Sequence, residues 1–270
     1  MGGYIEEREE LERRRKPKEE ELSVEEELLS RLDPLIEDRF IVEVIRPIKA
    51  GKEAVVYCCR AHPSIERELV AAKIFRPPEM RSFKKDGIYR QGREHMGPVD
   101  ARLLRGLAKK TRGGKLRRFN AWISHEMKTL EILHRAGADV PEPIERHGPV
   151  ILMEYIGTEE DPAPVLVGVT LGEDEARGIY RRLLNNVDLF LANNRVHSDL
   201  SAYNVLYSNG RGVIIDFPQA VDPRYNDDAF DLLVRDIKNL NAYFEDYDME
   251  LVDPIEHSLS IWRKHVDPLR

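Results

Sequence analysis

The first half of the chain alternates short apolar, β-branched runs with turn residues. Three such runs cover 40–45, 54–59 and 68–75, and a glycine turn at Gly51 separates the first two. Runs of this length and composition predict strands, and their close succession predicts an antiparallel meander. Leucines at helical spacing precede them, and 150–156 has the composition of a further strand.

The second half shows mainly the 3.6-residue period of amphipathic helices. Apolar side chains recur at three- and four-residue intervals over 119–135, 173–193 and 227–244, and a last helix is expected at 254–266. The segment 204–216 instead predicts a hairpin, because an Asn-Gly pair in its middle favours a two-residue turn.

This order of elements predicts an α+β protein with two lobes, a small antiparallel-sheet lobe with one key helix and a reduced helical lobe. The predicted boundaries are a charged N-terminal tail or helix at 1–38, the sheet lobe at 39–156 and the helical lobe at 157–270. Residues 6–27 hold 11 Glu and six Lys or Arg, so we expect this part of the tail to form no core of its own.

Composition excludes several classes of protein. Of the 270 residues, 41% are apolar, which is near the globular norm, and 34% are charged, which is high. These shares exclude a collagen-like or wholly disordered chain. No stretch approaches the roughly 18 apolar residues of a membrane helix, and we expect neither a membrane partner nor a secretory signal.

Cys58 and Cys59 are adjacent on a predicted strand and point to opposite faces, so they cannot form a disulfide. Reduced cysteines favour the cytoplasm.

Charge is distributed unevenly along the chain. The net charge is −7, yet the segment 76–118 holds 14 Lys and Arg against four acidic residues. Its prolines and glycines predict a long loop with a helix near 99–110. The positive charge, together with the rings of Phe83, Tyr89 and Phe119, makes RNA or a ribosomal precursor a candidate partner. A solvated flexible loop is the alternative.

Three polar side chains in the second half stand at the ends of apolar segments. Asp199 and Asn204 lie in the run His-Ser-Asp-Leu-Ser-Ala-Tyr-Asn, and Asp216 ends the predicted hairpin. A carboxylate in such a position is costly unless it is paired or binds a metal. Asn204 and Asp216 offer the hard oxygen ligands that Mg²⁺ prefers, which leaves Asp199 to accept a proton from an attacking hydroxyl. The spacing predicts a phosphoryl-transfer site that uses ATP and Mg²⁺. The alternative is that these residues cap turns.

Lys73 lies inside an apolar strand and needs a partner for its charge. Glu126 falls on the apolar stripe of the helix at 119–135, in line with Ile123 and Leu130. Because an isolated buried carboxylate is destabilising, we predict that Glu126 pairs with Lys73. Kinases use such a pair of a strand lysine and a helix glutamate to hold the α- and β-phosphates of ATP. A purely structural ion pair is the alternative.

Two weaker signals flank these residues. The turn with Gly51 and Lys52 offers a small residue and a positive charge for phosphate, although it matches neither a Walker A nor a Gly-x-Gly-x-x-Gly pattern. Glu154 and Ile156 end a strand at the junction of the two lobes, where backbone groups can meet an adenine edge. An ordinary core strand explains that segment equally well.

Together, these stretches resemble the RIO family of atypical serine/threonine protein kinases. The resemblance spans roughly 40–244. It rests on Gly-Lys-Glu-Ala-Val-Val-Tyr from Gly51, the helix around Glu126, the run from His197 to Asn204, and Ile-Asp-Phe-Pro-Gln around Asp216. The short segment before Gly51 makes the subfamily without an N-terminal winged helix the closer one.

The resemblance implies a bilobal kinase fold with ATP and Mg²⁺ in the cleft. It also implies autophosphorylation or ATP hydrolysis, and a role in maturation of the small ribosomal subunit. Asp199 would be the catalytic aspartate, and Asp216 would bind the metal with Asn204 and form an acyl-phosphate. The residues that the resemblance assigns to the nucleotide are Gly51, Lys52, Lys73, Glu126, Glu154 and Ile156.

The chain also departs from the family pattern. Lys49-Ala50 stands where the family usually carries Ser-Thr, and Ala202 replaces a glutamate. Two other functions stay open. One is an RNA- or ribonucleoprotein-binding ATPase switch, which the basic segment suggests. The other is a small-molecule kinase of the aminoglycoside or choline type, which shares the His-x-Asp-x-x-x-x-Asn run.

Overall fold

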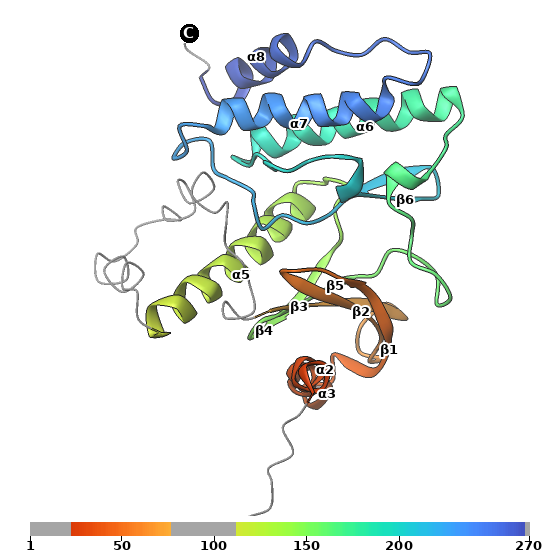
Figure 1. The fold of residues 1–270 in the computed structure, drawn as a ribbon, viewed down its shortest axis with the longest axis vertical. Helices are drawn as coiled ribbons and strands as arrows, with labels where there is room; N and C mark the ends of the chain where they lie inside the picture. Colours follow the sequence, from red (N-terminus) through yellow and green to blue (C-terminus); the bar gives the residue numbers. More distant parts are fainter. Residues whose placement is uncertain (1–22, 77–111, 268–270) are drawn as a thin grey trace, which may run out of the picture.

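The computed structural model describes residues 23–76 and 112–267. The helix predicted near 99–110 and most of the basic segment therefore lie outside the described residues. Figure 1 shows two lobes, one built on a sheet and one on helices, with the long helix α5 next to their junction. In the described part of the chain, no helix combines the length and the apolar character needed to cross a bilayer.

The smaller lobe is a five-stranded antiparallel sheet. Its first three strands, β1 (Ile41–Ala50), β2 (Ala54–Ala61) and β3 (Leu69–Phe75), form the predicted meander. β5 (Val150–Glu154) pairs with β3, and β4 (Pro143–His147) pairs with β5 at the far edge. The sequence did not predict β4, because a proline opens it and its side chains are only half buried, which is typical of an edge strand.

A short helical segment covers one face of this sheet. It consists of α2 (Val24–Leu29), the 3₁₀ turn η1 (Ser30–Leu32) and α3 (Asp33–Glu37). Ser23 and Glu26 form a capping box, which fixes the start of α2 within a highly charged stretch. Leu28, Leu32 and Leu35, three of the leucines predicted at helical spacing, are buried here with alternate residues of β2.

Helix α5 (Arg112–Arg135) packs against the opposite face of the sheet. Its described part runs from Arg112 and so includes residues before the predicted start at Phe119, because a helix extends through glycines at modest cost once its buried part is packed. Phe119 is buried and stacks on Trp122, so the expectation that its ring is available to bases was wrong. Cys58 and Cys59 are free thiols in the cores on opposite sides of the sheet.

The larger lobe contains three helices, α6 (Glu173–Ala192), α7 (Ala229–Phe244) and α8 (Pro254–His265). Each begins and ends within two residues of its predicted bounds. Below α6 and α7 lies the hairpin of β6 (Val205–Ser208) and β7 (Arg211–Ile214) (Figure 1). Positive φ angles of 52° and 72° at its Asn-Gly pair give the expected tight turn.

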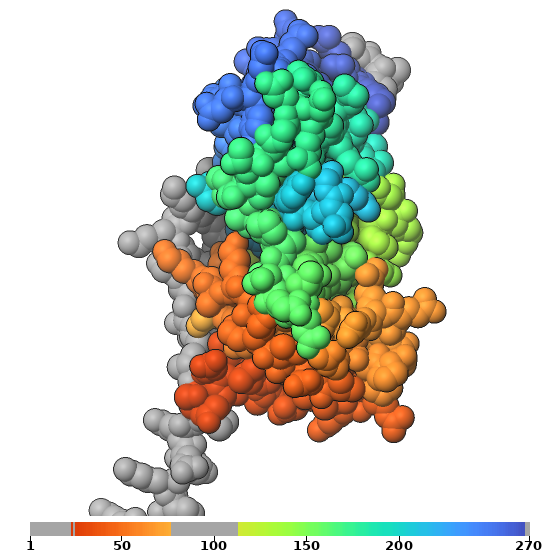
Figure 2. Space-filling model, turned by 90° about the vertical axis from the view of Figure 1, so that its right-hand side faces the viewer, coloured from red at the N-terminus to blue at the C-terminus, as the bar shows by residue number. Residues whose placement is uncertain are grey.

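One apolar core joins the two lobes. Ile123 of α5, Ile151 of β5 and Phe190 of α6 all belong to it and are almost completely buried. Figure 2 shows the segment after β5 (green) running along one face from the sheet lobe to the helical lobe. Gly157 starts this segment with a φ of 146°, and a Cβ there would lie 2.6 Å from the carbonyl oxygen of Asp161. Only glycine fits this connection without strain.

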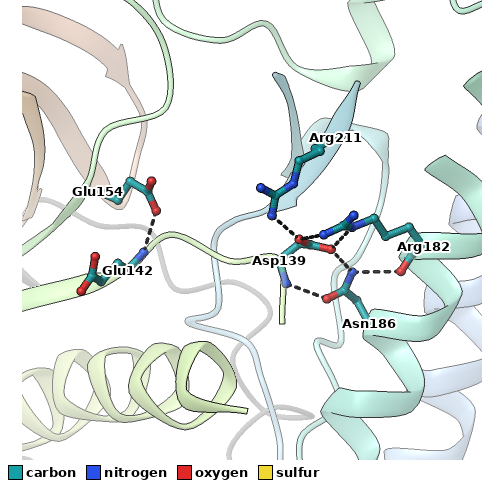
Figure 3. Close-up of polar contacts among 6 residues, drawn as sticks. All are labelled: Asp139, Glu142, Glu154, Arg182, Asn186 and Arg211. Atoms are coloured by element: carbon teal, nitrogen blue, oxygen red, sulfur yellow. Dashed lines mark hydrogen bonds and ion pairs between the residues drawn. The ribbon is translucent and has the colours of Figure 1, made fainter. Parts of the chain in front are cut away.

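A buried polar cluster reinforces the junction of the lobes (Figure 3). The carboxylate of Asp139, just beyond α5, accepts Nε and Nη2 of Arg182 at 2.5 and 2.7 Å and Nη2 of Arg211 at 2.8 Å. Asn186 donates Nδ2 to the same carboxylate at 2.9 Å and accepts the Asp139 backbone N–H at 2.7 Å. Burial alone would raise the pKa of Asp139, but these donors lower it to about 2. The backbone N–H of Ile214 also bonds to the Asp139 carbonyl at 2.8 Å, so the end of α5 is fastened to α6 and β7.

Candidate active site

Lys73 stands at the centre of an ion cluster in which it and Glu126 are buried, whereas Asp216 is partly exposed. Its Nζ donates to Oε1 of Glu126 at 2.6 Å and to Oδ1 of Asp216 at 2.6 Å. The three residues come from β3, from α5 and from the segment after β7, so one ammonium group joins both lobes. The predicted pair of Lys73 and Glu126 is formed, whereas the contact of Lys73 with Asp216 was not predicted.

The cluster has a definite distribution of charge. Burial alone would lower the pKa of Lys73, but the carboxylates of Asp216 and Glu126 raise it above its ordinary value. Burial raises the pKa of Glu126 to about 7, against the opposing charge of Lys73. For Asp216, burial would also raise the pKa, but the ammonium of Lys73 holds it below the ordinary value. At neutral pH, Lys73 is therefore a cation paired with an Asp216 anion.

The loop that follows α6 carries His197 and Asp199. His197 is buried, and burial lowers its pKa to about 4, so the ring is neutral at neutral pH. Its Nε2 donates to the carbonyl of Ile215 at 3.1 Å, and its Nδ1 accepts the backbone N–H of Asp199 at 3.3 Å. The neutral ring thus joins the loop to the chain that leads into Asp216.

Helix α7 fixes the same loop through a second carboxylate. Asp236 is buried, and its two oxygens accept the backbone N–H groups of Ser198 at 2.7 Å and Leu200 at 2.9 Å. The neighbouring Arg235 donates to the Ser198 carbonyl. Ser198 has a φ of 69°, which a residue with a side chain keeps only when its surroundings enforce it. Through these contacts, Arg235 and Asp236 tie α7 to the loop.

Asp199 is solvent-exposed in this loop and lies beside Asn204. The Nδ2 of Asn204 donates to the Asp199 carbonyl at 2.8 Å, and the Asn204 carbonyl accepts the backbone N–H of Ile215 at 2.9 Å. Although the residue is exposed, partial desolvation of its carboxyl group raises the pKa of Asp199, and the negative charge of Asp216 raises it further. Asn204 is therefore held between Asp199 and the chain entering Asp216.

Helix α5 supports the backbone around Asp216, whose φ is 73°. Nε1 of Trp122 donates to the carbonyl of Pro218 at 3.1 Å, and Nε2 of His125 lies 2.7 Å from the carbonyl oxygen of Ala220. The helix that supplies the buried glutamate thus also holds the segment after Asp216. The sequence analysis did not predict these contacts of Trp122 and His125. The pattern that could have indicated them is that both residues lie near Glu126 on the same helix.

The turn between β1 and β2 lies at the edge of the site. The backbone N–H of Gly51 donates to the carbonyl of Ala54 at 2.8 Å, which closes the turn, and Lys52 is exposed within it. The nearby Lys49 lies close enough for its charge to contribute to the lowered pKa of Asp216. Among the described residues, Gly51 and Lys52 form no hydrogen bond or ion pair with Lys73, Glu126 or Asp216; the Gly51 carbonyl instead accepts Nε of Arg76 at 3.1 Å.

Glu154 and Ile156 lie where the chain passes from β5 to the helical lobe. The Glu154 carboxylate accepts the backbone N–H of Glu142 at 3.1 Å (Figure 3) and Nη1 of Arg67 at 2.9 Å. The carbonyl of Ile156 accepts the backbone N–H of Ala163 at 2.9 Å. Since the Glu154 side chain is engaged in this way, a contact of these residues with a nucleotide base would use main-chain groups.

The oxygen atoms around Asp216 fit a magnesium ion. The Nδ2 of Asn204 is engaged, which leaves its amide oxygen as a ligand, and the anionic Asp216 side chain is 43% exposed. Mg²⁺ takes one or two such protein oxygens and completes its shell with waters and phosphate oxygens. Within the described ranges there is no group of three or more His, Cys, Asp or Glu that could hold a metal alone. A metal held by Asn204 and Asp216 would complete its shell with waters or phosphate oxygens.

The chain is similar in sequence to a family of protein kinases. The family model of the RIO domain matches residues 55–256. The human serine/threonine-protein kinase RIO1 is 33% identical over 206 residues, which cover 76% of this chain and 34% of the human protein. The RIO-type serine/threonine-protein kinase Rio1 of Thermoplasma acidophilum is 36% identical over 133 residues, which cover 49% of this chain and 68% of the archaeal protein. The chain thus spans about a third of the human relative's length.

The fold is similar to that of a solved kinase. The Rio2 kinase of Chaetomium thermophilum, in a complex with ADP, Mg²⁺ and phosphoaspartate, matches with a TM-score of 0.59 and 18% identity over 85% of this chain and 64% of that chain. A second structure of the same kinase matches with the same TM-score, over 84% of this chain. The predicted α+β, kinase-like fold is therefore confirmed.

Proposed function

Because this chain belongs to the RIO domain family, we propose that it is an ATP- and Mg²⁺-dependent phosphotransferase acting on serine or threonine hydroxyls. The observation that carries the proposal is the ion cluster in which Lys73 contacts both Glu126 and Asp216 at 2.6 Å. Three ionisable groups from distant parts of the chain are held together at the junction of the lobes, two of them buried, beside the loop that carries Asp199. Functional sites are where such costly arrangements of charge occur.

The roles that we propose for the residues are those that the family resemblance implies. Lys73, oriented by Glu126, would hold the phosphates of ATP, and Asn204 and Asp216 would hold Mg²⁺. Gly51 and Lys52 would cover the phosphates from the turn, and the main chain of Glu154 and Ile156 would meet the adenine. Bound Mg²⁺ would neutralise negative charge on the transferring phosphoryl group.

Asp199 would act on the acceptor hydroxyl. It is exposed, and its backbone is fixed by His197 and Asn204. An anion in this position orients the hydroxyl for in-line attack and accepts its proton. Such sites act mainly by positioning and by electrostatic stabilisation, which is consistent with a loop held by His197 and Asp236.

The family supports several further parts of the proposal. Autophosphorylation, an acyl-phosphate on Asp216 and action in small-subunit ribosome maturation accompany it as expectations from the resemblance. RNA binding through 76–118 also stays a prediction, since most of that segment lies outside the described residues. The buried free thiols support a reducing, cytoplasmic setting. The family match favours a protein acceptor over an aminoglycoside- or choline-type substrate.

Substitution of Asp199 tests the proposal. We expect Asp199→Asn to lose transfer of label from γ-labelled ATP in the presence of Mg²⁺ while it retains nucleotide binding, because the substitution removes only the anion at the acceptor. Asp231→Asn, which removes an exposed charge on α7, is the matched control. Hydroxylamine-labile label on the wild type would indicate an acyl-phosphate, and stable label a phosphoserine or phosphothreonine. An Asp199→Asn variant with the wild-type rate of transfer would refute the assignment.

A further inference from the structure

A cavity of about 570 Å³ opens on the helical lobe next to the catalytic loop. Three parts of the chain form its walls, namely the connection that enters α6, the loop residues 201–203 and the last turns of α7 with the residues that follow it. The residues used below are Thr170, Ser201, Tyr203, Tyr243, Asp246 and Tyr247. None of them has a part in the ion cluster or in the nucleotide site.

The cavity lies within reach of the acceptor position. Ser201 follows Asp199 by two residues, so their Cα atoms are at most about 7.6 Å apart. The α7 wall is fastened to the same loop, because Asn239 donates Nδ2 to the carbonyl of Leu200 at 3.0 Å. An extended peptide advances about 3.3 Å per residue. A peptide whose hydroxyl meets Asp199 can therefore place a side chain two to four positions away in this cavity.

The aromatic wall of the cavity is preformed. The hydroxyl of Tyr243 donates to the carbonyl of Val169 at 2.7 Å, and the hydroxyl of Tyr247 accepts the backbone N–H of Leu171 at 3.2 Å. These bonds hold the connection before α6 against the end of α7. A ligand would meet fixed rings and would not have to order them, which reduces the entropic cost of binding.

The chemistry of the lining favours a cation with an aliphatic stem. Asp246 is exposed and supplies the only carboxylate among the lining residues, and no Lys or Arg lines the cavity. Tyr203 is 65% exposed at its rim, and Thr170 and Ser201 add hydroxyl groups. Aromatic faces attract a guanidinium or ammonium group, and a carboxylate forms a charge-assisted hydrogen bond with it.

We propose that this cavity is an acceptor subsite that binds one arginine or lysine side chain of a protein substrate, near the serine or threonine that receives the phosphate. The inference rests on the proposed phosphotransferase function and adds the class of acceptor. A single carboxylate matches a single cation. A small molecule with several ammonium groups would need several acidic partners, which the lining does not provide.

Matched peptides test this subsite. Each peptide carries a central serine and one arginine. The arginine is placed in turn at each of the four positions before and the four positions after the serine. Each peptide is compared with one in which neutral citrulline replaces the arginine. For the wild type we expect a roughly three- to ten-fold higher kcat/KM for the arginine peptide at one or two positions, as for a partly exposed, charge-assisted contact. In Asp246→Asn this ratio falls to about one. In Asp246→Lys, a glutamate peptide becomes preferred at the same position.

The controls separate this subsite from the nucleotide site. Glu245→Gln removes an equal, exposed charge one residue away, outside the lining, and keeps the wild-type ratio. A wild type without any arginine preference, or a preference that survives Asp246→Asn, overturns the subsite. Transfer to an aminoglycoside but to no peptide would also overturn the subsite, and so would ATP hydrolysis without transfer to any peptide. In both cases the proposed nucleotide site would be retained. If ATP is not consumed at all, the proposed function itself has failed.

Discussion

Replacement of Asp139 by asparagine tests how the two lobes are held together. The substitution keeps the shape of the side chain and removes the charge that meets Arg182 and Arg211 (Figure 3). Asp139 has a side chain only 6% exposed, and its pKa falls from 3.8 to about 2 in the folded protein. At 1.36 kcal/mol per pKa unit, this shift corresponds to about 2 kcal/mol of stability. This free energy is an upper limit, because Arg182 and Arg211 are about half exposed and solvent screens their charges.

The pH dependence has a definite sign. Since the pKa of Asp139 is lower in the folded state, its contribution is complete well above 3.8 and is lost as the pH falls through about 2. At neutral pH we expect Asp139→Asn to unfold at a temperature roughly 4–8 °C below that of the wild type. About half of the difference in free energy should remain at pH 3.

Thermal and denaturant unfolding followed by circular dichroism measure this effect. Asp174→Asn is the control, because Asp174 is fully exposed and pairs with Arg177 on the surface at 3.2 Å. It should change the free energy of unfolding by less than about 0.5 kcal/mol. If Asp139→Asn were as stable as this control at neutral pH, the cluster would not hold the lobes together and the reasoning would be refuted.

Two further substitutions examine the site itself. Lys73→Met should reduce kcat/KM for ATP turnover by roughly a hundred-fold or more, since it removes the cation that both Glu126 and Asp216 contact; near-normal turnover would contradict its role. Asp236→Asn should cost about 1–3 kcal/mol of stability, because one of two buried N–H groups loses its acceptor. It should also lower kcat while the affinity for ATP changes little. Denaturant unfolding measures the stability, steady-state kinetics measures kcat, and nucleotide titration measures the affinity. Wild-type stability and kcat in the variant would show that the loop does not depend on Asp236.

Local patterns were sufficient to predict most of the fold. The helices α6, α7 and α8 and the hairpin turn were predicted almost to the residue, because periodicity and an Asn-Gly pair are properties of short windows. The strand β4 and the first turns of α5 were not predicted, because short windows of sequence do not contain what stabilises them. Their formation depends on a neighbouring strand and on a packed helix elsewhere in the chain, and their own residues carry prolines, glycines and exposed charges.

The candidate site shows the same limit. The burial of Glu126 could be predicted from its place on an apolar stripe, and a buried acid requires a cation, so Lys73 followed. The contact of Lys73 with Asp216 joins residues 143 positions apart, and the contact of Asp139 with Arg211 joins residues 72 positions apart. No local pattern encodes such contacts, because they arise only when separate elements pack together.

A crystal structure of the protein with Mg²⁺ and a non-hydrolysable ATP analogue tests the central claim most directly. We predict that the metal is bound by oxygens of Asn204 and Asp216, that a phosphate group lies against Lys73, and that Asp199 remains free to meet an acceptor. A nucleotide bound elsewhere on the protein, with the contacts of Lys73 to Glu126 and Asp216 undisturbed, would contradict the account.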